Sequence, residues 1–210
     1  MIRLIIADDH AIVREGLKQI VAGVPDMVVA GEASDGEELL KCLQRHDYDL
    51  VLLDITMPGQ SGLEILKQLR LQKPQLPVLI LSMHPEEQYA VRALRSGASG
   101  YLTKESVPRE LLQAIRKASS GGTYVSSSLA KRLDSDLLLD TEKQTYRYLS
   151  DREFEVMRKL VSGASIKNIA ESMQLSVKTV STYRYRVLTK LRMKTNAELI
   201  RYAIENGLVD

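Results

Sequence analysis

The sequence contains a single cysteine, Cys42, among its 210 residues. One thiol has no partner for an internal disulfide, and an isolated cysteine in an apolar helical stretch is more often a packing residue than a redox or metal site. Histidine is also scarce, and none of the three histidines has metal-ligand spacing to another. These absences argue against a disulfide scaffold and against a metal centre built from histidine and cysteine.

Long apolar runs are missing as well. The longest are far shorter than the roughly 20 residues that a membrane-spanning helix needs. The N-terminus leads into a strand-like segment and lacks the long apolar core of a signal peptide. We therefore expect no membrane association and a cytoplasmic location.

The composition is that of a packed protein, with 44% hydrophobic and 27% charged residues. A length of 210 residues suits one large domain or two small ones. The net charge of +2 is unevenly spread, since residues 144–210 carry 12 Lys/Arg and 7 Asp/Glu, whereas residues 1–143 carry 17 and 20. This asymmetry indicates a basic module beside an acidic one.

The first part of the chain alternates apolar strands with amphipathic helices. Strands are predicted at 2–7, 27–33, 50–54, 77–81 and 99–102, and helices near 11–23, 35–46, 61–72, 86–96 and 107–119. Several strands are continuous apolar runs, which is typical of a parallel sheet buried on both faces. We predict an α/β domain with a five-stranded, doubly wound parallel sheet over residues 1–121. A Ser-x-x-Glu capping box at Ser34 is expected to begin the second helix.

The rest of the chain changes character. Residues 122–146 follow a Ser-Ser-Gly-Gly break and are predicted to be a linker with some helix in it. Residues 147–210 are predicted to form a small all-α domain of four helices, whose capping boxes start at Ser150 and Thr195. Ser165 and Ser176 are expected to cap a short helix at 166–173 and a longer basic helix at 177–192. A short helix, a tight turn and a basic helix form a helix-turn-helix.

Polar side chains stand where the predicted strands end. Asp8 and Asp9 follow the first strand, Asp54 ends the third, Ser82 follows the fourth and Lys104 follows the fifth. Ligands of open parallel sheets bind outside the carboxyl ends of the strands, so these groups are expected at one edge. Three carboxylates there suit a hard divalent cation such as Mg²⁺, the ammonium can neutralise a phosphoryl group, and an aspartate can carry an aspartyl-phosphate.

The set resembles the receiver domain of two-component response regulators, which has a flavodoxin-like fold. The matching residues are Asp8, Asp9, Asp54, Met57-Pro58-Gly59, Ser82, Tyr101 and Lys104. The family commonly has a proline after the lysine, with a cis bond, whereas this chain has Glu105. A cis bond without proline costs roughly 3–4 kcal/mol, so we expect the Lys104–Glu105 bond to be trans.

The resemblance implies a role for each of these residues. Asp54 would accept a phosphoryl group from the phosphohistidine of a sensor histidine kinase, so the chain would not be an enzyme beyond its own phosphotransfer. Mg²⁺ would be held by Asp8, Asp9, Asp54 and the backbone carbonyl of Thr56. Ser82 and Lys104 would contact the phosphoryl group, and Ser82 with Tyr101 would form the switch. Thr56 and His84 stand at positions where the family tunes autodephosphorylation.

The second part resembles the LuxR-type DNA-binding domain of the NarL/FixJ family, through residues 149–156, 163–170, 175–182 and 190–191. Residues 176–192 hold five Lys/Arg and no acid, and such a helix fits the major groove. One face is expected to pack inward through Val177, Val180, Val187, Leu188 and Leu191. The predicted DNA contacts are Lys178, Thr179, Ser181, Thr182, Tyr185, Arg186, Thr189 and Lys190.

Two positions of the basic helix depart from the family or are ambiguous. Ser181 and Tyr183 replace the Lys and His that the family commonly has, which predicts a different base preference. Arg184 falls close to the apolar face, where a long basic side chain either snorkels, pairs with an acid or reaches DNA.

Together, the two resemblances imply a cytoplasmic transcription regulator. Phosphorylation of Asp54 would gate homodimerisation and binding to a palindromic or inverted-repeat DNA site. One alternative is a DNA-binding regulator that works without phosphorylation. Another is a Mg²⁺-dependent phosphatase, against which the sequence shows neither a substrate-pocket signal nor a second catalytic acid.

Overall fold

The computed structural model describes residues 1–57, 59–106, 108–126, 129–130 and 145–208. The chain divides into two compact units, Met1–Leu138 and Leu139–Asp210. None of the helices in these ranges is both long enough and apolar enough to cross a bilayer.

The first unit is built on a five-stranded parallel sheet with the order β2-β1-β3-β4-β5. The strands are β1 Ile2–Ala7, β2 Met27–Ala33, β3 Leu50–Asp54, β4 Val78–Ser82 and β5 Gly100–Thr103. The helices between and after them are α1 Ala11–Ala22, α2 Gly36–Arg45, α3 Gly62–Gln72, α4 Glu86–Arg95 and α5 Pro108–Ser119. This confirms the predicted fold class.

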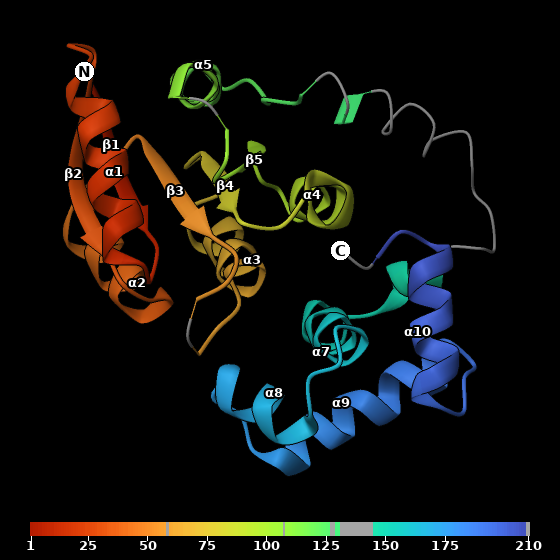
Figure 1. The fold of residues 1–210 in the computed structure, drawn as a ribbon. Coiled ribbons are helices and arrows are strands. Elements are labelled where there is room, and N and C mark those ends of the chain that lie inside the picture. Colours follow the sequence, from red (N-terminus) through yellow and green to blue (C-terminus); the bar gives the residue numbers. More distant parts are fainter. Residues whose placement is uncertain (58, 107, 127–128, 131–144, 209–210) are drawn as a thin grey trace. The chain divides into compact units, whose positions relative to one another are not determined.

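Apolar side chains on alternate strand positions bind the helices to the sheet. Leu4 and Ile6 of β1 and Leu50 and Leu52 of β3 join one core cluster with α1 and α5, which cover the same face of the sheet (Figure 1). All five residues of β3 and of β4 are buried. Burying one such aliphatic side chain contributes about 1.5–3 kcal/mol, so continuous apolar strands are strongly held between two helical layers.

The chain beyond α5 stays attached to the first unit. Tyr124 forms a parallel bridge with Gly100 of β5, and its backbone N–H donates to the Ser99 carbonyl at 2.8 Å. The Ser126 hydroxyl donates to Glu86 Oε2 at 2.6 Å, at the start of α4. The predicted linker at 122–146 otherwise falls largely outside the described residues, and the predicted domain limits stay a prediction.

The second unit consists of helices. A 3-10 turn at Thr145–Tyr148 precedes α7 Asp151–Val161, α8 Ile166–Ser172, α9 Val177–Lys190 and α10 Asn196–Glu205. Its core contains the fully buried side chains of Phe154, Ile169, Val180 and Leu199. Among the described residues, the four predicted helices and the helix-turn-helix are confirmed. Val177 is an exception on α9, because it is 51% exposed and does not pack inward with the other predicted apolar residues.

Capping residues set where these helices begin. Ser150 and Glu153 form the predicted box on α7, and Leu149 and Phe154 are both buried around it, as a hydrophobic staple requires. The prediction for α2 is wrong by one residue. Asp35, not Ser34, is the N-cap and accepts from the Glu38 N–H at 2.8 Å.

The turn between α8 and α9 is tight. Gln174 adopts a positive φ of 53°, and the Leu175 N–H donates to the Ala170 carbonyl at 2.8 Å. Few residues other than glycine take this conformation. It aims α9 away from α8, as a helix-turn-helix requires.

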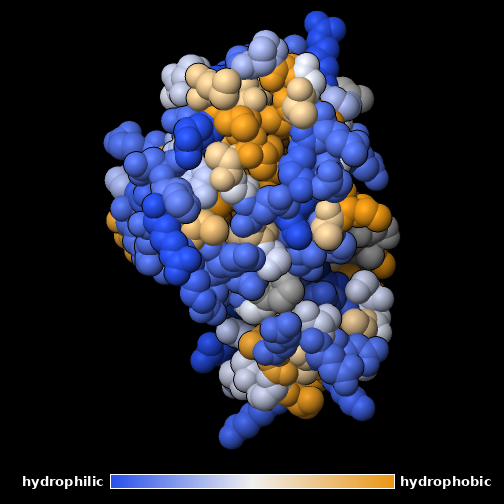
Figure 2. Space-filling view, turned by 90° about the vertical axis from the view of Figure 1, so that its left-hand side faces the viewer, coloured by the Kyte–Doolittle hydropathy of each residue, from blue (hydrophilic) through white to orange (hydrophobic). Residues whose placement is uncertain are grey.

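Figure 2 shows the side of the molecule on which α1, β2 and α2 lie in Figure 1. Apolar side chains gather there in a strip bordered by hydrophilic ones. Large apolar residues of the N-terminal segments that are exposed include Met1, Ile12 on α1 and Val28 on the edge strand β2.

Candidate functional site

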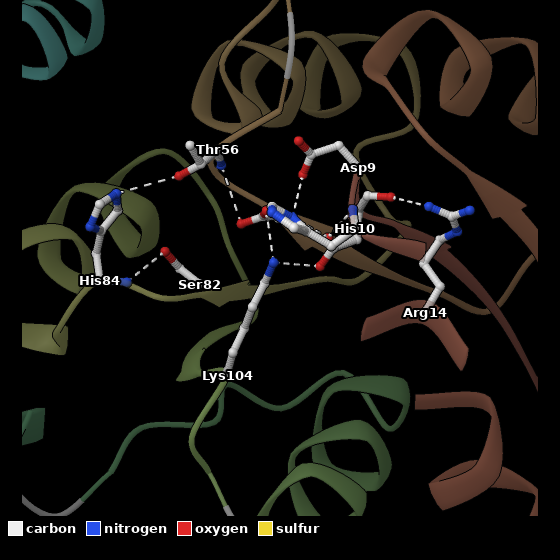
Figure 3. Close-up of polar contacts among 9 residues, drawn as sticks. Asp9, His10, Arg14, Thr56, Ser82, His84 and Lys104 are labelled. Carbon is white, nitrogen blue, oxygen red and sulfur yellow. Dashed lines mark hydrogen bonds and ion pairs between the residues drawn. The ribbon is translucent and has the colours of Figure 1, made fainter. Parts of the chain in front are cut away.

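The carboxyl ends of the strands bring together the residues that the sequence singled out (Figure 3). Asp8 follows β1, Asp54 is the last residue of β3, Ser82 is the last residue of β4, and Lys104 follows β5. Asp8, Asp54 and Ser82 are buried. Their position follows from parallel topology, because every strand ends at the same edge of the sheet.

Lys104 joins two of the carboxylates. Its Nζ lies 2.6 Å from Asp8 Oδ2 and 2.9 Å from Asp54 Oδ2, and its side chain is 6% exposed. Burial raises the pKa of Asp54, and the nearby charge of Asp8 adds to this, while the ammonium of Lys104 opposes it. Burial also lowers the pKa of Lys104, but the two carboxylates outweigh it and the pKa is raised. The lysine is therefore a fixed cation in the pocket.

Asp9 completes the acidic cluster from a more open position, since its side chain is 28% exposed. Asp8, Asp9, Asp54 and His10 offer ligand atoms that all lie within 4.8 Å of one another. The three predicted carboxylates therefore meet, as expected. Thr56 lies beside them, and its N–H donates to Asp54 Oδ1 at 3.2 Å.

His10 and Arg14 belong to this site but had not been assigned a role from the sequence. His10 Nδ1 lies 2.8 Å from Asp9 Oδ1 and 3.3 Å from Asp8 Oδ1, and its N–H donates to Asp8 Oδ1 at 2.9 Å. Arg14 donates to the Asp8 carbonyl at 2.7 Å. The only sequence signal was that His10 directly follows the acidic pair. These contacts orient Asp8 and Asp9 at the start of α1.

A second group of contacts connects Ser82 to Tyr101. The His84 N–H donates to the Ser82 hydroxyl at 3.1 Å, and the Tyr101 hydroxyl donates to the His84 carbonyl at 2.7 Å. Tyr101 is fully buried and points inward. The His84 ring stacks on Tyr89 with centroids 4.8 Å apart, and its Nε2 lies 3.4 Å from the Thr56 hydroxyl. His84 therefore lies between the pocket and α4, beside Thr56, the other position that the family resemblance had singled out for autodephosphorylation.

The second unit presents a separate surface on α9. Six of the predicted DNA contacts form one exposed stripe along that helix: Lys178, Ser181, Thr182, Tyr185, Arg186 and Thr189. They recur at helical spacings of three and four residues, so they share one face. The remaining two predicted contacts, Thr179 and Lys190, bond to side chains of the same unit. The Thr179 hydroxyl pairs with Ser176 at 2.8 Å, and Lys190 Nζ lies 2.6 Å from Glu153 Oε2.

Among the described residues, the partner of Arg184 is an amide and not an acid. Arg184 donates to the amide oxygen of Asn196 at 2.8 Å and so connects α9 to the start of α10. With Lys190 held by α7, two of the five cations counted on this segment make contacts inside the unit.

Comparison with known proteins finds a matching family for each of the two units. Residues 4–116 match the model for the response regulator receiver domain, and residues 147–203 match bacterial regulatory proteins of the luxR family. Response regulator UvrY of Escherichia coli K12 is 34% identical over 209 residues, covering 99% of this chain and 96% of that protein. The chain belongs to the two-component response regulators. Its receiver and LuxR-type helix-turn-helix place it in the NarL/FixJ group, whose members regulate transcription.

Other relatives of this protein are response regulators as well. Response regulator GacA of Pseudomonas protegens is 36% identical over 211 residues, covering 100% of this chain and 99% of that protein. Among solved structures, RcsB of Salmonella enterica serovar Typhimurium, bound to promoter rprA with a phosphomimetic BeF3⁻, superposes with a TM-score of 0.69 at 26% identity, covering 96% and 97% of the two chains. ChrA, from a heme-sensing two-component system, gives a TM-score of 0.54 at 30% identity, covering 99% and 98%.

Proposed function

We propose that this response regulator is phosphorylated on Asp54 by a sensor histidine kinase, and that this gates homodimerisation and DNA binding in the cytoplasm. The observation that carries the proposal is the Lys104 ammonium, held 2.9 Å from Asp54 and 2.6 Å from Asp8. A fixed cation beside a buried carboxylate favours a group that adds negative charge, and an aspartyl-phosphate carries up to about two negative charges where the carboxylate carries one.

The acidic cluster suits the magnesium that receiver domains use. Three carboxylates within 4.8 Å of one another provide the hard oxygen donors that Mg²⁺ prefers, and partial exposure of Asp9 leaves room for water. The residues that would hold the ion are Asp8, Asp9, Asp54 and the carbonyl of Thr56. When bound, the ion supplies positive charge that offsets the phosphoryl oxygens. His10 is a less suitable ligand for so hard a cation, and it serves better as the partner of Asp9.

The phosphotransfer step involves one bond that forms and one that breaks. A carboxylate oxygen of Asp54 forms the new P–O bond while the P–N bond of the donor phosphohistidine breaks, and the imidazole leaves with the electron pair of that bond. Lys104 then faces the new phosphoryl oxygens, and the Ser82 hydroxyl can donate to one of them. Ser82 now accepts from the His84 N–H, so its reorientation is transmitted to His84 and from there to Tyr101.

The second unit supplies the output. The stripe on α9 would enter the major groove, with Lys178 and Arg186 meeting phosphates or guanine edges. A homodimer would read two half-sites of a palindromic or inverted-repeat site, roughly 10 base pairs apart. The RcsB structure named above holds its promoter and a phosphomimetic together, which supports both halves of the proposal.

The phosphoacceptor assignment is tested with an acyl-phosphate donor and Mg²⁺, measuring incorporation by intact-protein mass. Asp54→Asn is expected to abolish the mass gain of one phosphoryl group. Asp47→Asn is the matched control, because that exposed aspartate lies just before β3, at the opposite end of the sheet. Undiminished incorporation into Asp54→Asn would remove the assignment.

A regulator that binds DNA without phosphorylation is the alternative. Affinity for a selected DNA site, measured with and without the donor, separates the two. Gating predicts tighter binding with the donor for the native protein and no change for Asp54→Asn. Equal affinity for the native protein under both conditions would favour the alternative.

A further inference from the structure

The exposed stripe of α9 has an uncharged middle. Lys178 and Arg186 stand toward its two ends, and between them Ser181 and Thr182 are both exposed on the side proposed to face DNA. The family commonly carries a charged residue at Ser181. At this place the chain offers hydroxyl groups instead.

Both hydroxyls are already engaged. Ser181 Oγ lies 2.8 Å from the carbonyl of Val177, and Thr182 Oγ1 lies 2.9 Å from the carbonyl of Lys178. A carbonyl oxygen only accepts, so each hydroxyl donates its single proton to the backbone carbonyl four residues earlier. What each side chain offers outward is an oxygen lone pair, and Thr182 also offers its methyl group.

The four bases differ in whether their major-groove edges can bind such a surface. Guanine presents only the acceptors N7 and O6, so it has nothing to give to an oxygen that has no free proton. Adenine N6 and cytosine N4 are the donors of that groove, and thymine alone adds a methyl group. A threonine that presents an acceptor and a methyl together matches an A·T pair.

We propose that Ser181 and Thr182 act as specificity-determining residues that read amino groups, and that Thr182 selects an A·T pair in each half-site. This rests on the proposed docking of α9 in the major groove. Guanine is then read only by the cations toward the ends of the stripe, and the centre of each half-site is recognised without charge.

The first test is DNA selection with the native protein, one variant of position 182 and one control variant. Thr182→Val keeps the shape and loses the acceptor, and is expected to relax one A·T position of the selected motif. Ser172→Ala is the control, because the Ser172 hydroxyl on α8 also donates to a backbone carbonyl, that of Ile169 at 3.1 Å, and Ser172 is not among the predicted DNA contacts. It is expected to leave that position unchanged.

The second test replaces the thymine of that pair by uracil, which removes only the methyl group. The native protein is expected to lose roughly fourfold in affinity, the value of one buried methylene-sized group. Thr182→Ser, which lacks the methyl, is expected to bind both DNAs equally. Equal losses in the two proteins, or a relaxed position that is G·C, would overturn the proposal. If the native protein selects no motif at all, the proposed DNA function fails instead.

Discussion

At the scale of single residues, Asp54 is held in place by a glycine that has no room for a side chain. A Cβ on Gly62 would overlap the backbone of Asp54 and Ile55. Its N–H donates to the Ile55 carbonyl at 2.8 Å, which joins the start of α3 to the end of β3. The loop that follows Asp54 is thus closed by direct backbone contact.

We predict opposite effects for two glycine-to-alanine substitutions. Gly62→Ala should lower the free energy of unfolding of the receiver by about 1–3 kcal/mol, because backbone must shift to admit the methyl. Gly16→Ala should raise it by about 0.5–1 kcal/mol, because this exposed glycine inside α1 has open space around it. Urea unfolding of the two variants is the measurement. A neutral Gly62→Ala would show that the close approach is not maintained in solution.

The sequence revealed those site residues that stand at strand ends. Asp8, Asp54 and Lys104 could be placed together because parallel strands end at one edge of the sheet. The contacts of His10 and His84 could not be placed, since they depend on the direction in which a loop side chain turns. Strand periodicity carries no information about that direction.

At the scale of elements, α7 and α9 are joined at a helix cap by an ion pair between a buried carboxylate and a partly exposed lysine. The Glu153 carboxylate accepts from the Ser150 N–H at 2.7 Å and from Lys190 Nζ at 2.6 Å, and its side chain is 4% exposed. Burial raises the pKa of Glu153, but the lysine and the Ser150 N–H outweigh it and the pKa is lowered. One carboxylate thus caps α7 and holds the C-terminal end of α9.

This arrangement predicts a pH dependence for the helical unit. A lowered folded-state pKa means that the stabilisation is present above the unfolded glutamate value of about 4.3 and is lost as the pH falls through the folded value. Thermal unfolding should therefore show Glu153→Gln less stable than the native protein at pH 7, with the gap narrowing below pH about 4.3. Glu171→Gln, at an exposed position of α8, should show no such gap. A gap that stays constant down to low pH would contradict the ionic origin.

Element boundaries followed from sequence patterns to within one or two residues. β1, β2 and β3 match their predicted limits, whereas β4 and β5 begin one residue later than predicted. The exposure of Val177 shows where pattern alone fails. An apolar residue at the first position of α9 has the helical spacing for packing, but the described part of the chain leaves Val177 51% exposed, whereas Val180 one turn later is buried.

At the scale of the whole molecule, each unit has a hydrophobic core of its own. We predict two calorimetric transitions on heating. Gly62→Ala should shift only one of them. Ser150→Ala should shift only the other, since loss of an N-cap costs about 1 kcal/mol. A single transition that both variants move would show that the units unfold as one.

The charge of Lys178 predicts how the DNA affinity of the intact chain depends on salt. If Lys178 meets a DNA phosphate, Lys178→Met should lower the slope of log affinity against log salt concentration by about one unit. Lys41→Met makes the same change in net charge on α2, where the lysine pairs with Glu37 at 2.6 Å, and should leave the slope unchanged. The measurement is DNA affinity over a series of salt concentrations. Equal slopes for both variants would remove the phosphate contact.

The bridge between Tyr124 and Gly100 has a practical consequence for dissecting this protein. An uncovered edge strand exposes unpaired N–H and C=O groups, which can pair with a strand of another molecule and lead to aggregation. A receiver fragment cut at residue 121, where the helical pattern stops, would strip β5 of this cover and lose the bond from Ser126 to Glu86. A fragment that continues through residue 130 retains both contacts, and its β5 edge stays covered. It should therefore be less prone to self-association.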